Sequence, residues 1–351
     1  MWDFYKDKYK KMMIIPLILA IPLLFLVLIF PGIQPGVDLT GGNVLIIRSE
    51  NPIVESQLVS VLKENFSLQE LKVSTIASPT GYGAWIQYSK DPLVTNVENV
   101  LNKASDSLEV EKDSIAASNE ALKLLNQPTQ EFANAKAALM AAQQALADYK
   151  EAFSKKLQDT LTEKLQLGAK VEFQKREISP TLGASSFSSS VFVSILGMIM
   201  ITIVVFAAFR QFIPSAAIIQ AMLFDALAGL AGMALLQIPL SLTTLPALLM
   251  LIGYSVDTDI MLTSRMLKGK DGTPGERATS SMKTGITMTS TALAALVVMI
   301  VISFFYQIEV IYQIAVILFF GLIGDIIATW LMNAPVLLWW VEKKEKEHKK
   351  F

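Results

Sequence analysis

The sequence predicts an α-helical polytopic membrane protein with six transmembrane helices and one folded domain outside the membrane. Three observations predict this fold class. Hydrophobic residues make up 52% of the 351 residues, which is high for an ordinary soluble protein. Apolar runs recur that are long enough to cross a hydrocarbon core about 30 Å thick. A single long hydrophilic stretch, from Gln34 to Gly183, separates the first run from the others.

Six apolar runs are predicted to span the membrane. The first is followed by Pro31 and Gly32 and has no small-residue cleavage site, so we interpret it as an uncleaved anchor rather than a signal peptide. The sixth is too long for one straight span, and we expect its first turns to lie at the interface or to tilt. The predicted spans are residues 12–30, 187–209, 212–236, 240–263, 285–306 and 310–341.

The basic residues predict the orientation of these spans. With six spans, all Lys and Arg residues outside the hydrophilic stretch fall on one side, and the short loops around Gln237 and Gln307 on the other side carry none. The positive-inside rule then places both termini in the cytoplasm of a plasma-membrane protein. The expected cytoplasmic parts are the N-tail 1–11, the loop 264–284 and the C-tail 342–351.

The extracytoplasmic segment, residues 31–185, is expected to form an α+β ferredoxin-like domain. Its patterns follow the order β-α-β-β-α-β of a split βαβ unit, with the first helix at 52–65 and the second beginning near Leu93. Residues 105–165 are rich in Ala, Lys, Glu, Gln and Leu at helical spacing. We predict that they form an inserted helical hairpin, either a solvated coiled coil or a dedicated binding element.

Composition excludes several classes of function. The chain has no cysteine, and its single histidine, His348, lies in a charged tail, so thiol chemistry, histidine catalysis and zinc binding are not expected. No segment fits the phosphate-binding loop of ATPases. A net charge of −1 implies no general attraction to nucleic acid. We therefore expect a transport component rather than an enzyme, with no metal, no cofactor and no nucleic-acid partner, surrounded by membrane lipid.

Four acids lie within predicted spans: Asp225, Asp257, Asp259 and Asp325. A charged carboxylate at mid-membrane costs roughly 2.5–3.5 kcal/mol, so each needs a partner, a water cavity or a proton. Asp257 and Asp259 point about 200° apart around a helix, so they must face different neighbours. Each acid is either a structural, protonated group that bonds between helices or a proton carrier.

Two further features lie near these acids. Arg265 ends the fourth span, where reaching to the interface is its default role. In the fifth span Thr284, Thr287 and Thr291 share one face. Threonine hydroxyls in helices commonly bond their own backbone, but beside a carboxylate the same stripe would pass or orient a proton.

Three short motifs resemble the SecD and SecF subunits of the protein-export machinery. Residues 36–42 (GVDLTGG) resemble the signature after their first span, and residues 178–183 (ISPTLG) resemble the segment before their second. Residues 253–256 (GYSV), followed by an acid and then Arg265, are similar to the fourth-span motif of SecF. The motif residues expected to be structural are Gly36, Asp38, Gly41, Gly42, Pro180 and Gly183.

The resemblance implies a six-helix half of an RND-type bundle, paired with SecD beside the Sec translocon channel, that helps to draw the translocating polypeptide outward. It implies H⁺, or Na⁺, as the coupled ion. Bacterial SecF places its acid where Thr258 stands, so the ion-relay role falls to Asp257 first and to Asp259 second. The other relay candidates are Asp325, Asp225, Arg265, Lys283, Thr287 and Thr291. The inserted hairpin and the lack of cysteine suit an archaeal form.

Three alternatives remain open from the sequence. An RND-type exporter of small molecules or lipids would use the same acids and needs a deep apolar pocket in the external domain. An intramembrane aspartyl protease would need Tyr-Asp and Gly-x-Gly-Asp motifs, and the segment 321–325 (GLIGD) has the wrong glycine spacing. A structural partner of SecD with silent aspartates is the third.

Overall fold

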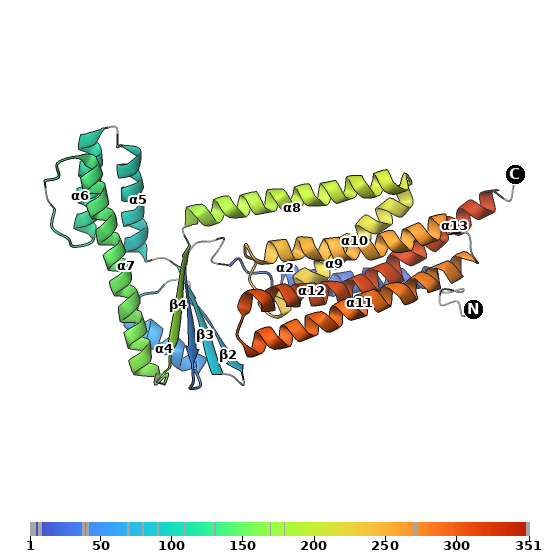
Figure 1. Ribbon diagram of the computed structural model, residues 1–351, viewed down its shortest axis with the longest axis horizontal. Helices are drawn as coiled ribbons and strands as arrows, with labels where there is room; N and C mark the ends of the chain where they lie inside the picture. The colour runs from blue at the N-terminus through green and yellow to red at the C-terminus, as the bar shows by residue number, and fades with distance from the viewer. Residues whose placement is uncertain are drawn as a thin grey trace. The chain divides into compact units, whose positions relative to one another are not determined.

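The structure is a computed structural model (Figure 1) that describes residues 5, 9–36, 39, 42–68, 71–78, 81–89, 91–108, 110–129, 131–168, 170–178, 180–269 and 272–348. The chain divides into two compact units. Residues 1–40 and 180–351 form one, here called the membrane unit because it holds the six long apolar helices. Residues 41–179 form the other, here called the external unit.

The external unit is built on a four-stranded antiparallel sheet with the strand order β2-β3-β1-β4. The central strand β1 pairs with β3 on one side and with β4 on the other. The predicted α+β domain with a small antiparallel sheet is therefore confirmed. The strands are β1 Gly42–Ser49, β2 Lys72–Ser78, β3 Gly81–Tyr88 and β4 Glu172–Ile178.

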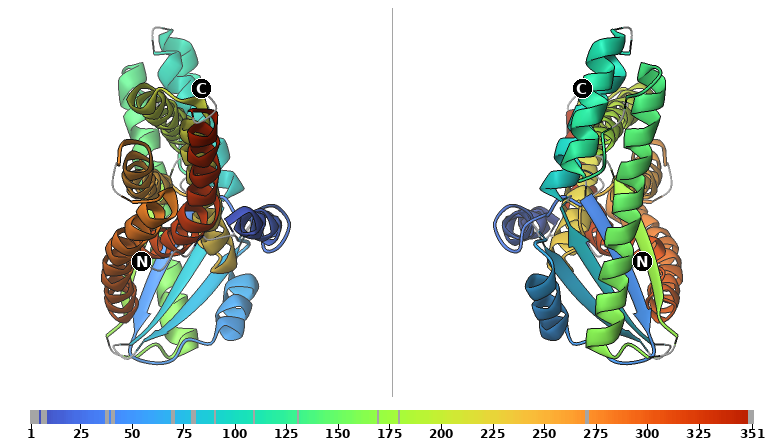
Figure 2. Two further views of the ribbon diagram at one scale, coloured as in Figure 1. Left: turned by 90° about the vertical axis from the view of Figure 1, so that its right-hand side faces the viewer. Right: turned by 90° about the vertical axis from the view of Figure 1, so that its left-hand side faces the viewer.

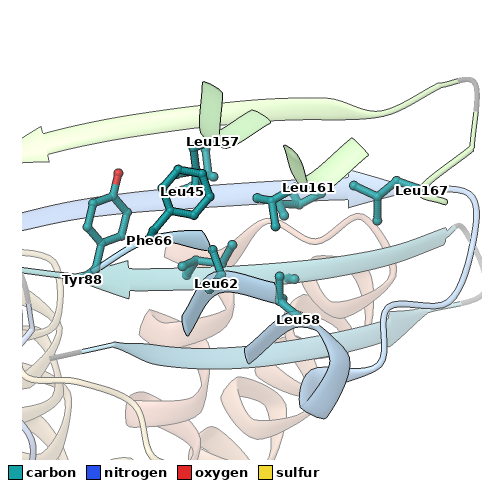
Figure 3. Packing of buried hydrophobic residues seen from close by; sticks show 11 residues of the cluster. Leu45, Leu58, Leu62, Phe66, Tyr88, Leu157, Leu161 and Leu167 are labelled. Atoms are coloured by element: carbon teal, nitrogen blue, oxygen red, sulfur yellow. The ribbon is translucent and has the colours of Figure 1, made fainter. Parts of the chain in front are cut away.

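Two helices, α4 (Glu55–Asn65) and the second half of α7 (Ala135–Leu165), form the core of the external unit with the sheet (Figures 2 and 3). Leu58 and Leu62 of α4 are fully buried, as is Leu161 of α7. They pack with strand residues such as Leu45, because apolar side chains four residues apart share one face of a helix. Helix α4 begins at Glu55, later than expected, after an extended Val54.

The expected hairpin is part of a larger three-helix arrangement. Helices α5 (Pro92–Asp106) and α6 (Glu111–Leu124) pack with the first half of α7 around a separate apolar cluster (Figure 1). Helix α7, 31 residues long in all, does not end at this cluster but continues onto the sheet. The helix that covers the sheet beside α4 is thus α7 rather than the helix beginning near Leu93.

One charged side chain ties the three-helix arrangement to the sheet. Lys150 of α7 lies with its Nζ 2.8 Å from Oε1 of Glu98 on α5 and 2.5 Å from Oε1 of Glu177 on β4. Burial lowers the pKa of Lys150, but the hydrogen bonds to Glu177 and Glu98 outweigh it, so this pKa lies above its ordinary value. The ammonium group therefore stays charged between the two carboxylates.

The membrane unit contains six helices that are long and apolar enough to cross a membrane. Together with the family described below, this makes the chain a multi-pass membrane protein. Helix α9 packs on α2, α10 and α12, and α12 also packs on α10 and α11. The elements are α1 Tyr9–Met12, α2 Ile14–Leu28, α8 Pro180–Phe209, α9 Phe212–Leu235, α10 Thr244–Lys268, α11 Pro274–Phe305, α12 Glu309–Ala328, η1 Thr329–Asn333 and α13 Ala334–His348.

The helices extend beyond the apolar runs on the side expected to be cytoplasmic. Helix α10 runs to Lys268 and α11 begins at Pro274, so most of the expected loop 264–284 is helical. A capping box between Thr273 and Glu276 satisfies the first N–H groups of α11. An apolar run marks where a helix crosses lipid, whereas caps mark where the helix begins.

Helices α9 and α12 approach closely because small residues face each other. A Cβ atom on Gly324 would lie 2.5 Å from the Cβ of Ala228 and 3.5 Å from the Cα of Asp225. One on Gly232 would lie 2.4 Å from the ring of Phe320. Small residues permit this approach in membrane helices, where van der Waals packing replaces the hydrophobic effect.

We expect Leu161→Ala to destabilise the external unit by about 2–5 kcal/mol, because it leaves a cavity between α7 and the sheet. Amide hydrogen exchange of β1 in the full chain measures the loss. Met140→Ala is the matched control, since Met140 is 56% exposed on the same helix, and its effect should stay within about 0.5 kcal/mol. Equal exchange rates in the two variants would contradict the packing described.

Candidate functional site: a buried carboxyl cluster

Three of the four intramembrane acids converge in the membrane unit. Asp225 of α9, Asp259 of α10 and Asp325 of α12 are each fully buried. Asp225 and Asp325 are brought together by the close approach of α9 and α12 at Gly324. We call these three residues and the polar side chains bonded to them the carboxyl cluster.

The hydrogen bonds of the carboxyl cluster come from buried side chains on three helices. Ser255 donates its hydroxyl to Oδ2 of Asp225. Asn333 donates its Nδ2 to Oδ1 of Asp259 at 2.7 Å. Thr289 of α11 lies with its Oγ1 3.5 Å from Oδ2 of Asp325, at the limit of a hydrogen bond.

Thr329 lies between two carboxyl groups and has only one hydroxyl proton. Its Oγ1 is 2.9 Å from Oδ1 of Asp259 and 3.0 Å from Oδ1 of Asp325. A hydroxyl donates one hydrogen bond, so if both contacts are hydrogen bonds, one of the two acids must carry a proton and donate it to Thr329. The geometry therefore suits a proton shared among the acids.

The carboxyl cluster has more oxygen acceptors than donors. Among the described residues, Oδ1 of Asp225, Oδ2 of Asp259 and Oδ1 of Asn333 have no hydrogen-bond partner. Within the same described ranges, none of the three acids forms an ion pair with a Lys or Arg. Buried carboxylates without a basic partner are costly, so this arrangement demands a bound proton or another small cation.

Asp257 lies apart from the carboxyl cluster. It is exposed on α10, as expected from the angle that separates it from Asp259. Gly253, Tyr254 and Arg265 are exposed along the same helix, and a Cβ atom on Gly253 would meet nothing within 4 Å. We call these four residues the open face of α10.

The threonine stripe of α11 also lies outside the carboxyl cluster. Thr287 and Thr291 are exposed, and their hydroxyls donate to the backbone carbonyls of Lys283 and Met288 at 2.8 and 2.7 Å. Lys283 is exposed as well, and Arg265 donates through Nη1 to the hydroxyl of Thr284 at 3.0 Å. Of the fifth span's hydroxyls among the described residues, that of Thr289 is the one that reaches a buried acid.

Two of the motif glycines, Gly36 and Gly42, occupy positions where backbone approaches backbone. The N–H of Gly36 donates to the carbonyl of Leu240 at 2.7 Å, and a Cβ atom on Gly36 would lie 3.0 Å from that oxygen. Gly42 begins β1 with a φ of 137°, which favours glycine. Pro180 and Gly183 lie in the first turns of α8. Asp38 and Gly41 lie outside the described residues.

Two members of the carboxyl cluster were not identified from the sequence. Thr329 and Asn333 follow Asp325 at intervals of four residues, which places polar groups along one face of the last span. That spacing indicates a polar face that continues from Asp325. The pattern crosses the π-helical segment η1, however, where residues four apart do not keep the phase of a regular helix.

Comparison with known proteins points to one family. The model of the family described as "Protein export membrane protein SecD/SecF, C-terminal" matches residues 156–343. A protein-export membrane protein SecF of Methanothermobacter thermautotrophicus is 29% identical over 342 residues, which are 97% of this chain and 95% of the relative. A SecF of Methanolacinia petrolearia is 41% identical over 170 residues, which are 48% of this chain and 60% of the relative.

Two solved structures share the fold. A SecDF in the super-membrane-facing form superposes with a TM-score of 0.52 at 18% identity, over all of this chain and 41% of its own. SecDF from Thermus thermophilus, a translocon-associated membrane protein, superposes with a TM-score of 0.58 at 12% identity, over 97% of this chain and 60% of its own. The expected bundle of membrane helices with an additional α+β domain agrees with these folds.

We expect Thr329→Val to destabilise the membrane unit by about 1–3 kcal/mol, because it removes the hydroxyl between two buried carboxyl groups without changing the side chain's shape. Thermal unfolding in detergent measures the loss. Thr202→Val is the matched control, since the Thr202 hydroxyl donates to the Met198 carbonyl of its own helix at 2.8 Å. A control that unfolds as early as Thr329→Val would contradict the bonding described.

Proposed function

Because this chain belongs to the SecD/SecF family of protein-export membrane proteins, we propose that it is a SecF subunit of the archaeal type that couples an ion gradient to polypeptide export. The family model covers more than half of the chain. The relatives described above carry the name SecF and match either nearly the whole chain or, at higher identity, about half of it.

The carboxyl cluster is the observation that carries the proposal of ion coupling. Three buried acids from three helices lack a basic partner among the described residues, so gain or loss of one cation changes the charge that α9, α10 and α12 enclose. One charge that crosses 100 mV releases about 2.3 kcal/mol. That energy is enough to shift a two-state equilibrium by roughly fiftyfold.

We favour H⁺ as the coupled ion, with Na⁺ as the alternative. The contacts of Thr329 with Asp259 and Asp325 are at hydrogen-bond distances of 2.9 and 3.0 Å, as expected for a shared proton. A bound Na⁺ would instead be coordinated by the unpartnered oxygens of Asp225 and Asp259. We assign the ion to Asp225, Asp259 and Asp325 rather than to Asp257, which was first among the relay candidates from the sequence.

The open face of α10 supports a second membrane subunit as partner. A carboxylate such as Asp257 is costly against lipid, so a polar or protein surface is expected to cover it. The solved SecDF chains are longer than this chain, which spans 41% and 60% of them, so they hold further protein beside the matching part. We propose that a SecD subunit covers the open face of α10.

We further propose that the subunit acts beside the Sec translocon channel, with both termini in the cytoplasm and the external unit contacting the exported polypeptide. The distribution of Lys and Arg supports the orientation. An exporter of small molecules is less well supported. Such an exporter needs a deep apolar pocket, whereas one hollow of the external unit, about 520 Å³, is lined mainly by polar or charged residues such as Ser56, Gln57 and Lys164. Another, beside Tyr88, Tyr149 and Phe153, has a volume of about 290 Å³, at the lower end of the roughly 300–1,000 Å³ usual for small-molecule sites.

We expect Asp259→Asn and Asp325→Asn each to lower gradient-dependent export at least tenfold, because an amide does not bind and release a proton. Export of a reporter into inverted vesicles, with a pH gradient or a Na⁺ gradient imposed separately, measures the loss and identifies the ion. Asp148→Asn, on the exposed face of α7, is the control. Normal export in both variants would favour a structural role, and loss only in Asp257→Asn would move the ion site to the open face of α10.

We expect Gly253→Trp to reduce co-purification with SecD about tenfold while leaving the chain's own thermal stability unchanged. The new side chain has open space in this chain but would clash with a subunit that covers the open face of α10. Ile21→Trp on α2 is the control, since Ile21 is 70% exposed on a helix that packs on α9 and η1. Unchanged co-purification of Gly253→Trp would exclude this face as the contact.

A further inference from the structure

The last span changes its helical register at the carboxyl cluster. In η1 the N–H of Ala334 donates to the carbonyl of Thr329, five residues back, instead of to Trp330, four residues back. The cause is Pro335, which has no N–H and whose ring clashes with the preceding turn of a regular helix. The π turn relieves this clash.

The register change affects which side chains face the carboxyl cluster. In a regular α-helix three residues spaced by four drift around the axis by about 40° at each step, or about 80° in all. The wider π turn offsets this drift across Asp325, Thr329 and Asn333. As a result the hydroxyl of Thr329 and the amide of Asn333 both reach Oδ1 of Asp259, at 2.9 and 2.7 Å.

The register change also removes the usual donor from one buried carbonyl. The carbonyl of Trp330 loses Ala334, which now bonds Thr329, and the next residue along the chain, Pro335, has no N–H to offer. An unpaired buried carbonyl is costly. The π turn therefore needs a donor from outside its own helix.

Tyr5 supplies that donor. Its hydroxyl donates to the carbonyl of Trp330 at 3.1 Å across 325 residues of sequence, and its side chain is 1% exposed. The ring packs in a cluster with Leu262 and Met266 of α10 and Ala278 of α11. Tyr5 thus reaches into the bundle at the carbonyl that the π turn deprives of its own helix's donors.

We propose that Tyr5 is a positioning residue for the carboxyl cluster, because its hydrogen bond to Trp330 holds the π turn that aims Thr329 and Asn333 at Asp259. The proposal rests on the proposed function, in which the carboxyl cluster exchanges an ion. Loss of this hydrogen bond leaves the Trp330 carbonyl unpaired and destabilises the π turn that Pro335 requires, so that Asn333 is no longer held toward Asp259. Tyr5 is thereby linked to ion binding through the backbone of η1.

The test follows protonation of Asp259 and Asp325 in the purified full chain. Dicyclohexylcarbodiimide reacts with protonated carboxyl groups, and mass spectrometry reads its attachment at each acid across a range of pH. Tyr5→Phe keeps the ring but removes the hydroxyl. We expect labelling of Asp259 to persist to a pH about 0.5–1 unit higher, or roughly three- to tenfold in the protonation equilibrium, because donors to its charged form are lost.

Tyr9→Phe is the matched control. It removes the bond from the Tyr9 hydroxyl to Oε2 of Glu342 on α13, 2.8 Å long, which involves no atom of η1. The titratable groups of the carboxyl cluster among the described residues are Asp225, Asp259 and Asp325, whereas Asp257, Arg265 and Lys283 are exposed. The labelling curve of Tyr9→Phe should superpose on that of the unchanged chain.

Three outcomes would overturn the proposal. The first is a labelling curve of Tyr5→Phe that is identical to that of the unchanged chain. The second is an equal shift of the curve in Tyr5→Phe and Tyr9→Phe. The third is an unchanged chain whose Asp259 reacts at no pH, because Tyr5 would then have no protonation to influence. Labelling is measured without export. Tyr5→Phe can therefore show the expected shift in labelling of Asp259 while Asp259→Asn exports normally. That combination would reject the proposed function and leave the role of Tyr5 intact.

Discussion

Carboxyl oxygens enclosed by apolar helices must have their charge balanced locally, and much of the membrane unit is arranged around this constraint. Asp225, Asp259 and Asp325 come from three helices, so no single helix can satisfy them alone. The small residues at the crossing of α9 and α12 bring two of the acids together, and the π turn brings the donors. Oδ1 of Asp225 and Oδ2 of Asp259 have no hydrogen-bond partner among the described residues, which is why we propose that a mobile cation completes the balance.

The two acids of α10 show how one helix serves two surroundings. Asp259 faces the bundle and shares Thr329 with Asp325, whereas Asp257 faces outward on the open face of α10. A partner subunit that covers Asp257 would therefore contact the same helix that carries the buried acid. In the proposed function, ion binding inside the bundle and subunit contact outside it involve two faces of one helix, so a rotation of α10 would change both together.

Sequence patterns predicted the parts of this structure that depend on local composition. Apolar run length located the six membrane helices, and the order of alternating and helical patterns predicted the split βαβ sheet. Residue spacing also separated Asp257 from Asp259 correctly. Features that depend on how helices meet were out of reach. Nothing in the chain's periodicity says that Asp225 and Asp325 meet across Gly324, that Thr287 and Thr291 face away from them, or that Tyr5 bonds a carbonyl 325 residues away.

The external unit has a mechanical property that follows from the length of α7. A helix of 31 residues is about 45 Å long, and here it is shared between two apolar clusters. One half packs on the sheet and the other in the three-helix arrangement. Near the junction, Lys150 forms ion pairs with Glu98 of α5 and Glu177 of β4 and so links the two parts. A tilt of about 5° at the sheet would carry the far end through about 4 Å. A straight helix of this length would therefore convert a small rotation at the sheet into a larger displacement of the three-helix arrangement.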